Sequence, residues 1–226
     1  MILANEKISY PGLIYNISNI WEEAQEYCRI IHYKKNQNFL FVSENSYDFC
    51  YVHTGSVKGL FIENEGNCRT NFIFQKGALI NETSFLSKAY SDKILFSCTC
   101  PTTIYYFDSA LINESFKANY PHLMENMFYS IAVKLLNIQT MTNAICTKSS
   151  LELFCWYLYS MGKHHNFAHE FVPLIGKSDI ASLLGISNTA LKRNINFLIS
   201  EDIIQQFTKK LVIITDYNKL KNLAKK

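Results

Sequence analysis

The sequence predicts an α+β fold in which an N-terminal antiparallel β-roll of the jelly-roll type precedes a long helix and a C-terminal winged helix-turn-helix. Three observations support this fold class. Short β-prone runs fill the first half of the chain, a long stretch without Gly or Pro follows, and two short helical segments with a hairpin come last. We expect residues 1–118 to form the roll, 119–146 the long helix and 147–226 the winged domain.

The composition is that of a folded globular protein, with 226 residues, 48% of them hydrophobic and 18% charged. The first ten residues lack the apolar core of a secretion signal, and no apolar run reaches the roughly 18 residues of a membrane-spanning helix. We therefore expect a cytoplasmic protein without a membrane partner. Its seven cysteines are an odd number, so we expect reduced thiols without a disulfide framework.

Six β-prone runs predict the roll, each rich in aromatic and β-branched residues. Turn-forming residues separate them, including Thr54-Gly55-Ser56 and Asn64-Glu65-Gly66-Asn67. Several strands at this spacing predict an antiparallel roll or sandwich. The runs cover residues 39–42, 49–52, 57–62, 71–74, 94–98 and 103–107.

A long helix is predicted from Pro121, a residue that suits the first turn of a helix, to about Asn143. Its seam alternates steps of three and four residues and is apolar except at Lys134, a pattern that favours pairing with a second copy of the chain. An ordinary amphipathic helix packed on a core is the alternative, because the pattern is short. The predicted dimer interface consists of Met124, Met127, Ile131, Ile138, Met141 and Ile145.

A second helix is predicted from about Ser149 to Met161, where Gly162 would end it. Histidines follow at positions 164, 165 and 169, and helical or turn spacing could bring two of them together. Glu170 is the one carboxylate beside them, so we expect solvated loop histidines and no metal site.

Residues 177–198 predict two short helices joined by a tight turn, with Gly185 in the left-handed conformation and Ser187 capping the second helix. The polar side chains of the second helix would lie opposite its apolar ones. Arginine, asparagine, lysine and threonine suit the base edges of a DNA major groove, whereas a plain helical hairpin with a polar face is the alternative. The residues predicted to contact DNA from this helix are Ser187, Asn188, Thr189, Lys192, Arg193 and Asn196.

A β-hairpin is predicted over residues 203–215, and its tip carries Lys209 and Lys210 in a position to reach phosphates. Positive charge also concentrates in this part of the chain. From Lys177 to Lys226 there are nine Lys or Arg against four Asp or Glu, whereas the whole chain has a net charge of +3. A basic segment of this kind is expected where a protein meets double-stranded DNA.

With these features in this order, the chain resembles the Crp/Fnr family of regulators from about Tyr27 to Leu223. The segment Tyr51-Val52-His53-Thr54-Gly55-Ser56-Val57 is similar to the family's strand that enters a Gly-Ser-Val turn, and Glu65-Gly66-Asn67 is similar to the hairpin that follows. Ser178-Asp179-Ile180 and Leu184-Gly185-Ile186-Ser187 fit the family's helix-turn-helix.

The resemblance implies a transcription regulator and not an enzyme: a homodimer that reads a palindromic DNA site, with a roll that senses an effector. RNA polymerase would be a further partner. Arg193 falls on the family's base-reading arginine position. Thr189 stands where many members carry a glutamate, so we expect a half-site different from the common one.

The effector pocket departs from that of the family's cyclic-nucleotide members, which bind phosphate with a Gly-Glu pair and a later Arg-Ser or Arg-Thr pair. Here Glu82 matches, Asn81 replaces the glycine, and Asp92 and Lys93 stand in the place of the second pair. A carboxylate repels a cyclic phosphate, and a lysine does not reproduce an arginine fork. We expect a pocket with Glu82, Tyr90 and Lys93 that does not bind cAMP, and no cofactor.

Other functions stay open at this stage. Cys98 and Cys100 would face the same way on a regular strand and could be oxidised together, although packed thiols are the stronger expectation. A cupin-like metal-dependent enzyme would use roll histidines, of which there are only His32 and His53. A scaffold whose helix-turn-helix contacts protein would bind independently of DNA phosphates.

Overall fold

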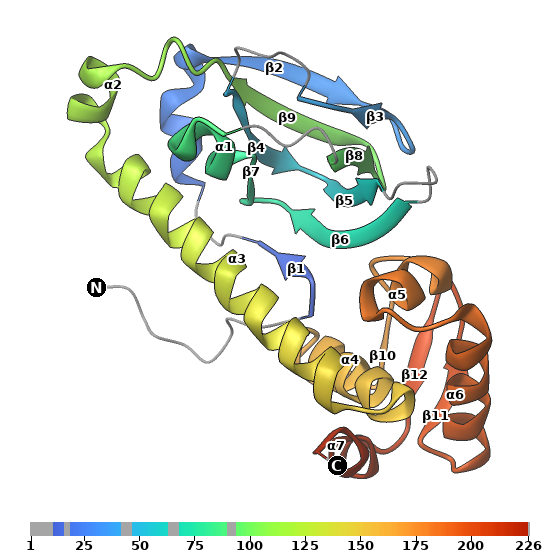
Figure 1. The fold of residues 1–226 in the computed structure, drawn as a ribbon. Coiled ribbons are helices and arrows are strands. Elements are labelled where there is room, and N and C mark those ends of the chain that lie inside the picture. The colour runs from blue at the N-terminus through green and yellow to red at the C-terminus, as the bar shows by residue number, and fades with distance from the viewer. Residues whose placement is uncertain (1–10, 16–18, 42–46, 63–67, 90–93, 226) are drawn as a thin grey trace. The chain divides into compact units, whose positions relative to one another are not determined.

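The computed structural model describes residues 11–15, 19–41, 47–62, 68–89 and 94–225 (Figure 1). The chain forms two compact units, one of residues 13–135 and the other of residues 1–12 and 136–226. The long helix α3 (Pro121–Thr147) is continuous across the boundary between them. The first unit therefore contains the roll and the first half of α3, and the second contains the rest of α3 and the C-terminal elements.

Two sheets build the roll, as the sequence predicts, with the strand orders β1-β6-β5-β8-β3 and β2-β9-β4-β7. Its described strand pairs are antiparallel, apart from the parallel pair of β1 with β6. The strands are β1 (Leu13–Ile14), β2 (Cys28–Tyr33), β3 (Asn38–Phe39), β4 (Phe49–Thr54), β5 (Ser56–Ile62), β6 (Cys68–Gln75), β7 (Leu79–Ile80), β8 (Ile94–Cys98) and β9 (Thr102–Phe107).

Strand β4 shows how the roll's core is organised. Phe49 and Tyr51 belong to a cluster on one face of the strand, together with residues of the helices. Cys50 and Val52 belong to a second cluster, with residues of both sheets. All four are fully buried, because successive side chains of a strand alternate between its faces and both faces are covered here.

Helical segments cover the outer face of the β2-β9-β4-β7 sheet (Figure 1). They are the 3-10 segment η1 (Ile20–Tyr27), α1 (Glu82–Ser87), α2 (Glu114–Asn119) and the first half of α3. Trp21 of η1 is completely buried and its indole Nε1 donates to Asn126 Oδ1 of α3 at 2.9 Å. This bond satisfies the polar atom of a large apolar side chain in the core.

The turn between β4 and β5 requires its glycine. Gly55 has a φ of +91°, and a Cβ there would lie 2.6 Å from the carbonyl oxygen of Pro101. The Gly-Ser-Val segment noted in the sequence therefore forms a tight turn packed against the start of β9. The Glu65-Gly66-Asn67 segment lies outside the described residues.

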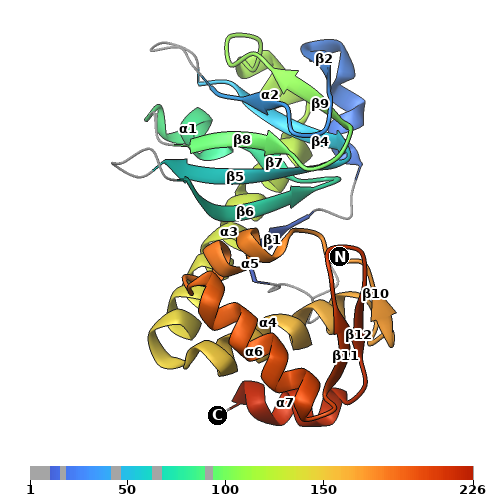
Figure 2. The ribbon, with the colours of Figure 1, turned by 90° about the vertical axis from the view of Figure 1, so that its right-hand side faces the viewer.

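The second unit combines helices with a small sheet of order β10-β12-β11 (Figure 2). Ser149 caps α4 through a capping box, in which its hydroxyl accepts from Glu152 N and Glu152 Oε2 accepts from Ser149 N. The elements are α4 (Ser150–His164), β10 (Glu170–Phe171), α5 (Lys177–Leu184), α6 (Asn188–Ser200), β11 (Ile204–Phe207), β12 (Val212–Ile214) and α7 (Tyr217–Lys225).

Several predicted boundaries were wrong. Helix α3 extends to Thr147, and α4 continues through Gly162 to His164. Gly162 serves packing rather than termination, because a Cβ there would lie 2.2 Å from Cε1 of Tyr217. Strand β3 covers only Asn38–Phe39 of the run predicted to end at residue 42, which itself lies outside the described residues.

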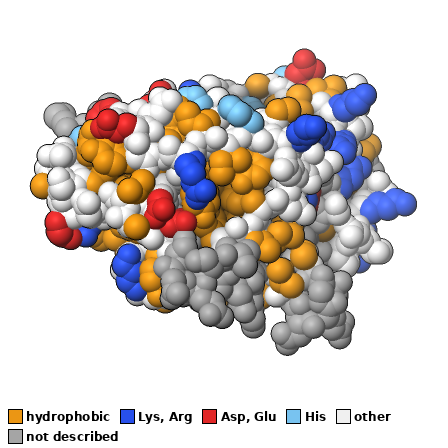
Figure 3. Space-filling model, turned by 90° about the horizontal axis from the view of Figure 1, so that it is seen from above, with side chains coloured by type: hydrophobic (Ala, Val, Ile, Leu, Met, Phe, Trp, Pro, Cys, Tyr) orange, Lys and Arg blue, Asp and Glu red, His pale blue; other side chains and the backbone are white. Residues whose placement is uncertain are grey.

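The roll exposes some apolar side chains, with Ile30, Leu40, Phe61 and Leu111 all more than one-third exposed. On the face shown in Figure 3, apolar side chains form patches that charged and histidine side chains interrupt. None of the helices in the described part of the chain has both the length and the hydropathy to span a membrane.

Candidate nucleic-acid interface

Helices α5 and α6 form the helix-turn-helix that the sequence predicts. Gly185 ends α5 with a φ of +66°, and its backbone N–H donates back to the last turn of the helix. Ser187 caps α6, its hydroxyl accepting from Ala190 N at 3.1 Å. The turn is therefore fixed at one end by a backbone hydrogen bond of Gly185 and at the other by the side-chain cap of Ser187.

One face of α6 is buried and the other is exposed. Leu191, Ile195 and Leu198 lie in the core of the second unit. The opposite face exposes polar side chains over two turns of the helix, so they can be presented together to one surface. These exposed residues are Asn188, Thr189, Lys192, Arg193 and Asn196, all five of which the sequence singles out. Their contact with DNA stays a prediction.

The two charged side chains on the exposed face of α6 are free to contact a partner. Lys192 and Arg193 are exposed, and among the residues that the structure describes neither is in an ion pair. An unpaired guanidinium or ammonium can bond base edges or phosphate oxygens without first breaking an internal contact.

Asn194 is a residue of α6 that the sequence analysis missed. It is 3% exposed, and its amide Nδ2 donates to the carbonyl oxygen of Ser150 at 2.9 Å. This bond ties α6 to the first turn of α4. The signal was present in the spacing, because position 194 lies three residues after Leu191 and four before Leu198, on the buried face.

The predicted wing is also present, as the hairpin of β11 and β12 (Figure 2). Its turn is closed by Thr208, whose backbone N–H donates to Leu211 O at 2.8 Å and whose hydroxyl accepts from Leu211 N at 3.0 Å. Lys209 and Lys210 are exposed at the tip. The turn presents both ammonium groups to solvent, which suits contact with phosphates.

Several positions of the predicted dimer seam on α3 are covered by the chain itself instead of being exposed. Met127 is completely buried in the roll's core, Met124 packs against that core, and Met141 is only 9% exposed. Lys134 also turns toward the roll, where it pairs with Glu82. These positions therefore contact the chain itself and are not available to a second copy.

The remaining predicted positions lie on an exposed apolar stripe of α3. Ile138 is 45% exposed, Ile145 is 36% exposed and Ile131 is partly buried. Phe128 and Leu135, at 61% and 54% exposure, continue the stripe at steps of three and four. We call this set the α3 stripe: Phe128, Ile131, Leu135, Ile138, Thr142 and Ile145.

Comparison with solved structures finds the same arrangement in transcription regulators of the CRP/FNR family. A CooA mutant from Carboxydothermus hydrogenoformans matches with a TM-score of 0.77 and 16% identity, over 92% of this chain and 95% of that chain. CprK complexed with OCPA matches with a TM-score of 0.76 and 14% identity, over 95% and 98%. FixK2 from Bradyrhizobium japonicum matches with a TM-score of 0.71 and 15% identity, over 87% and 96%.

The chain has the CRP/FNR-type fold. A scan against protein-family models and a search of the curated proteins found no match. The likeness at these identities therefore concerns the fold, and the residues of this chain carry the argument for function.

In this CRP/FNR-type roll, Asn81 and Glu82 stand at the start of α1. Asn81 has a φ of +69°, in the left-handed region that favours glycine and that asparagine tolerates, and its Nδ2 donates to Asp48 O at 2.7 Å. Glu82 is completely buried and bonded by Lys134 and Ser130. Of the predicted pocket, Tyr90 and Lys93 lie outside the described residues, as does Asp92.

The thiols of the CRP/FNR-type roll do not form the arrangement expected of a redox pair. Strand β8 ends at Cys98, so Cys100 lies beyond the regular strand. Both are free thiols, and Cys98 is completely buried. Burial raises the pKa of the Cys98 thiol, which disfavours the reactive thiolate.

The histidines lie at several places in this fold, and the ring centroids of His164 and His165 are 5.0 Å apart. His53 Nδ1 lies 3.1 Å from Glu22 Oε1 and its ring stacks on Tyr105, whereas His32 Nδ1 lies 3.1 Å from the Thr103 hydroxyl. His165 stacks on Phe171. The described residues contain no group of three His, Cys, Asp or Glu that could hold a metal ion.

Proposed function

We propose that the chain is a sequence-specific DNA-binding transcription regulator that acts as a homodimer on a palindromic site. The observation that carries the proposal is the exposed polar face of α6, on a helix whose opposite face is buried and whose first turn is capped. Arg193 would bond two acceptors of a guanine, Asn188 or Asn196 would pair with an adenine, and Lys209 and Lys210 would contact phosphates.

The proposed dimer contact is the α3 stripe, in place of the seam read from the sequence. Large apolar side chains exposed at heptad spacing on a long helix are stabilised when a second helix covers them. A homodimer that reads successive major grooves needs its two copies of α6 roughly 34 Å apart, which is one turn of DNA. A two-fold symmetric protein reads a palindrome for that reason.

The proposed regulator has a cellular location, a further protein partner and a roll that can sense an effector. A regulator of this type works in the cytoplasm and acts on RNA polymerase, and it is not an enzyme. Its roll responds to an effector other than cAMP, or to none, because Asn81 and the acidic Asp92 stand where a cyclic phosphate would need different groups. Added cAMP is therefore expected to leave operator affinity unchanged.

Salt dependence of duplex binding tests the proposal. Fluorescence anisotropy would measure binding of the full chain to a pool of random duplex DNA from low to moderate ionic strength. Affinity should fall steeply with salt, because phosphate contacts release counterions. The double variant Lys209→Gln/Lys210→Gln should reduce the slope of log K against log salt by about one unit for each phosphate that is no longer neutralised.

The matched control is Lys219→Gln/Lys221→Gln on α7, which removes two exposed lysines outside the proposed interface and should leave the slope nearly unchanged. Absence of binding to any duplex at low ionic strength would contradict the proposal. Salt-independent behaviour would instead favour a scaffold whose helix-turn-helix binds protein.

A further inference from the structure

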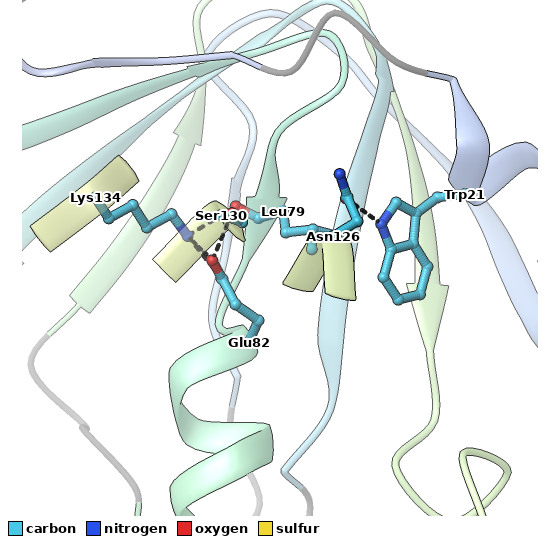
Figure 4. A network of polar contacts seen from close by, with 6 residues as sticks. All are labelled: Trp21, Leu79, Glu82, Asn126, Ser130 and Lys134. Carbon is cyan, nitrogen blue, oxygen red and sulfur yellow. Dashed lines mark hydrogen bonds and ion pairs between the residues drawn. The ribbon is translucent and has the colours of Figure 1, made fainter. Parts of the chain in front are cut away.

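A buried ion pair joins the roll to the first half of α3 (Figure 4). Lys134 Nζ lies 2.5 Å from Glu82 Oε1 and 2.6 Å from Glu82 Oε2. The Glu82 side chain is 0% exposed and that of Lys134 is 12% exposed. Both residues belong to the same compact unit.

The chain itself satisfies both charged groups. The Lys134 ammonium has three N–H donors, and its acceptors are the two Glu82 oxygens and Leu79 O at 3.0 Å. Glu82 Oε1 also accepts from the Ser130 hydroxyl at 2.8 Å, and the ammonium lies 5.1 Å from the centre of the Phe74 ring. An added ligand would have to displace one of these contacts to reach either charge.

A small cavity lies near the pair, beside Ser130. The cavity beside Ser130, lined also by Ala78 and Val133, has a volume of about 10 Å³. That volume accommodates about one water molecule. This cavity is therefore too small for a nucleotide-sized molecule.

We propose that Lys134 is a ligand built into the chain, whose ammonium occupies the site at Glu82 and holds the first half of α3 against the roll without a separate effector. A buried charge that loses its partner is strongly unfavourable, so the pair favours the state in which helix and roll are in contact. Because α3 continues into the second unit, its position on the roll is coupled to the DNA-binding elements; this step rests on the proposed function.

Chemical rescue tests the proposal. The substitution Lys134→Ala removes Cγ, Cδ, Cε and the Nζ ammonium of the side chain. Propylammonium has the same three carbons and the same charged group, so it can refill the space when added to the variant. The variant should lose about tenfold or more in affinity for an operator selected with the wild-type chain, within the usual range of coupling between sites. Propylammonium should restore that affinity, and propanol, which lacks the charge, should not.

Ser130→Ala is the matched control, because it removes one hydrogen bond to Glu82 from the same helix and leaves the ion pair intact. Its loss of operator affinity should be smaller than that of Lys134→Ala, and propylammonium should not reverse it, because the ammonium of Lys134 still occupies the site. If the Lys134→Ala variant does not fold by itself, it can be refolded in the presence of propylammonium. Its melting temperature should then rise with the concentration of propylammonium and should not rise with propanol.

The outcomes separate the inference from the function on which it rests. Wild-type affinity retained by Lys134→Ala, or a loss that propylammonium does not reverse, would overturn the built-in ligand while leaving the regulator in place. Hydrogen exchange of α3 against the roll reports on the pair without DNA, and unchanged protection in Lys134→Ala would likewise overturn the inference. A wild-type chain that selects no operator contradicts the proposed function instead.

Discussion

Arg193 is the side chain on which base recognition depends most directly in the proposed interface. It is exposed on α6 one turn after Thr189. Arg193→Ala should cost about 1–3 kcal/mol of binding free energy and relax the preference at one position of each half-site, because alanine cannot bond the two acceptors of a guanine. Anisotropy titrations against an operator and its single-base variants measure both effects.

The variant Lys209→Ala, which removes a proposed phosphate contact, is the comparison for Arg193→Ala, which removes a proposed base contact. A phosphate contact carries no sequence information, so its removal should weaken binding equally for all the operator variants. An Arg193→Ala chain that keeps both its affinity and its preference would remove α6 from the interface.

The thiols differ in reactivity according to their burial. Cys68 and Cys146 are exposed, whereas burial raises the pKa of Cys155 to about 12 and that of Cys50 well above the ordinary thiol value. Since the thiolate is the nucleophile, a raised pKa lowers the reactive fraction at neutral pH. Alkylation at neutral pH should therefore reach the exposed Cys68 and Cys146 before the buried Cys50 and Cys155.

Mass spectrometry of the alkylated peptides checks this order. Cys50 and Cys155 should be modified only when denaturant unfolds the chain. Modification of Cys155 in the folded protein at the rate seen for Cys146 would contradict the packing described for α4.

Among the elements, α3 has one face covered by its own chain and one that is exposed. One face packs on the roll through Leu123, Met127 and Lys134, and the α3 stripe is exposed. Ile138→Asp should dissociate the proposed dimer and lower operator affinity more than it lowers helix content, because a charge is introduced into an apolar contact. Sedimentation velocity and circular dichroism measure the two quantities.

Asn143→Asp is the matched control for this variant, since it adds the same charge at an exposed position of α3 outside the stripe. It should sediment like the wild type. A dimer that survives Ile138→Asp at micromolar concentration would show that copies of the chain associate elsewhere.

Helix α4 depends on a close approach to α7. Tyr217 lies where a Cβ at Gly162 would be, and its hydroxyl donates to Ala168 O at 2.6 Å, which holds the ring in place. Gly162→Ala should therefore lower the free energy of unfolding by about 1–3 kcal/mol, the usual effect of overpacking. Chemical denaturation gives this value.

Gly176→Ala is the appropriate comparison. Its φ is −74°, and the atom nearest to an added Cβ is Asp179 Oδ2 at 3.8 Å, so the methyl group fits. Equal stability of the two alanine variants would show that α7 does not pack on α4 as described.

Elements with strong local signals could be predicted from the sequence. The helix-turn-helix has a glycine at its turn and a serine cap, and the wing has apolar strands around a Thr-Lys-Lys tip, so each is specified by neighbouring residues. The exposed face of α6 followed from its period of 3.6 residues.

Elements set by tertiary contacts could not be predicted in this way. Strands β1 and β7 have two residues each and exist through their pairing with β6 and β4. Met127 and Ile131 are both apolar at heptad positions, and only the position of the roll decides that Met127 is buried against it. The role of Lys134 likewise depends on Glu82, which is 52 residues away in the chain.

Along the whole chain the roll comes first, the continuous helix α3 second and the helix-turn-helix after it, and the fold matches that of CRP/FNR-type structures. This order connects a roll that contacts α3 with the helix-turn-helix that follows it. The proposed regulator therefore needs the full chain, and tests of DNA binding should use it.

Selection of bound sequences from random duplex DNA is the sharpest test of whether the chain reads DNA as a homodimer. The full chain at low ionic strength should enrich a palindrome whose half-sites are centred about one helical turn apart, roughly 10 base pairs, because two copies of α6 enter successive major grooves. Enrichment of a single unpaired half-site, or of no sequence at all, would contradict the account.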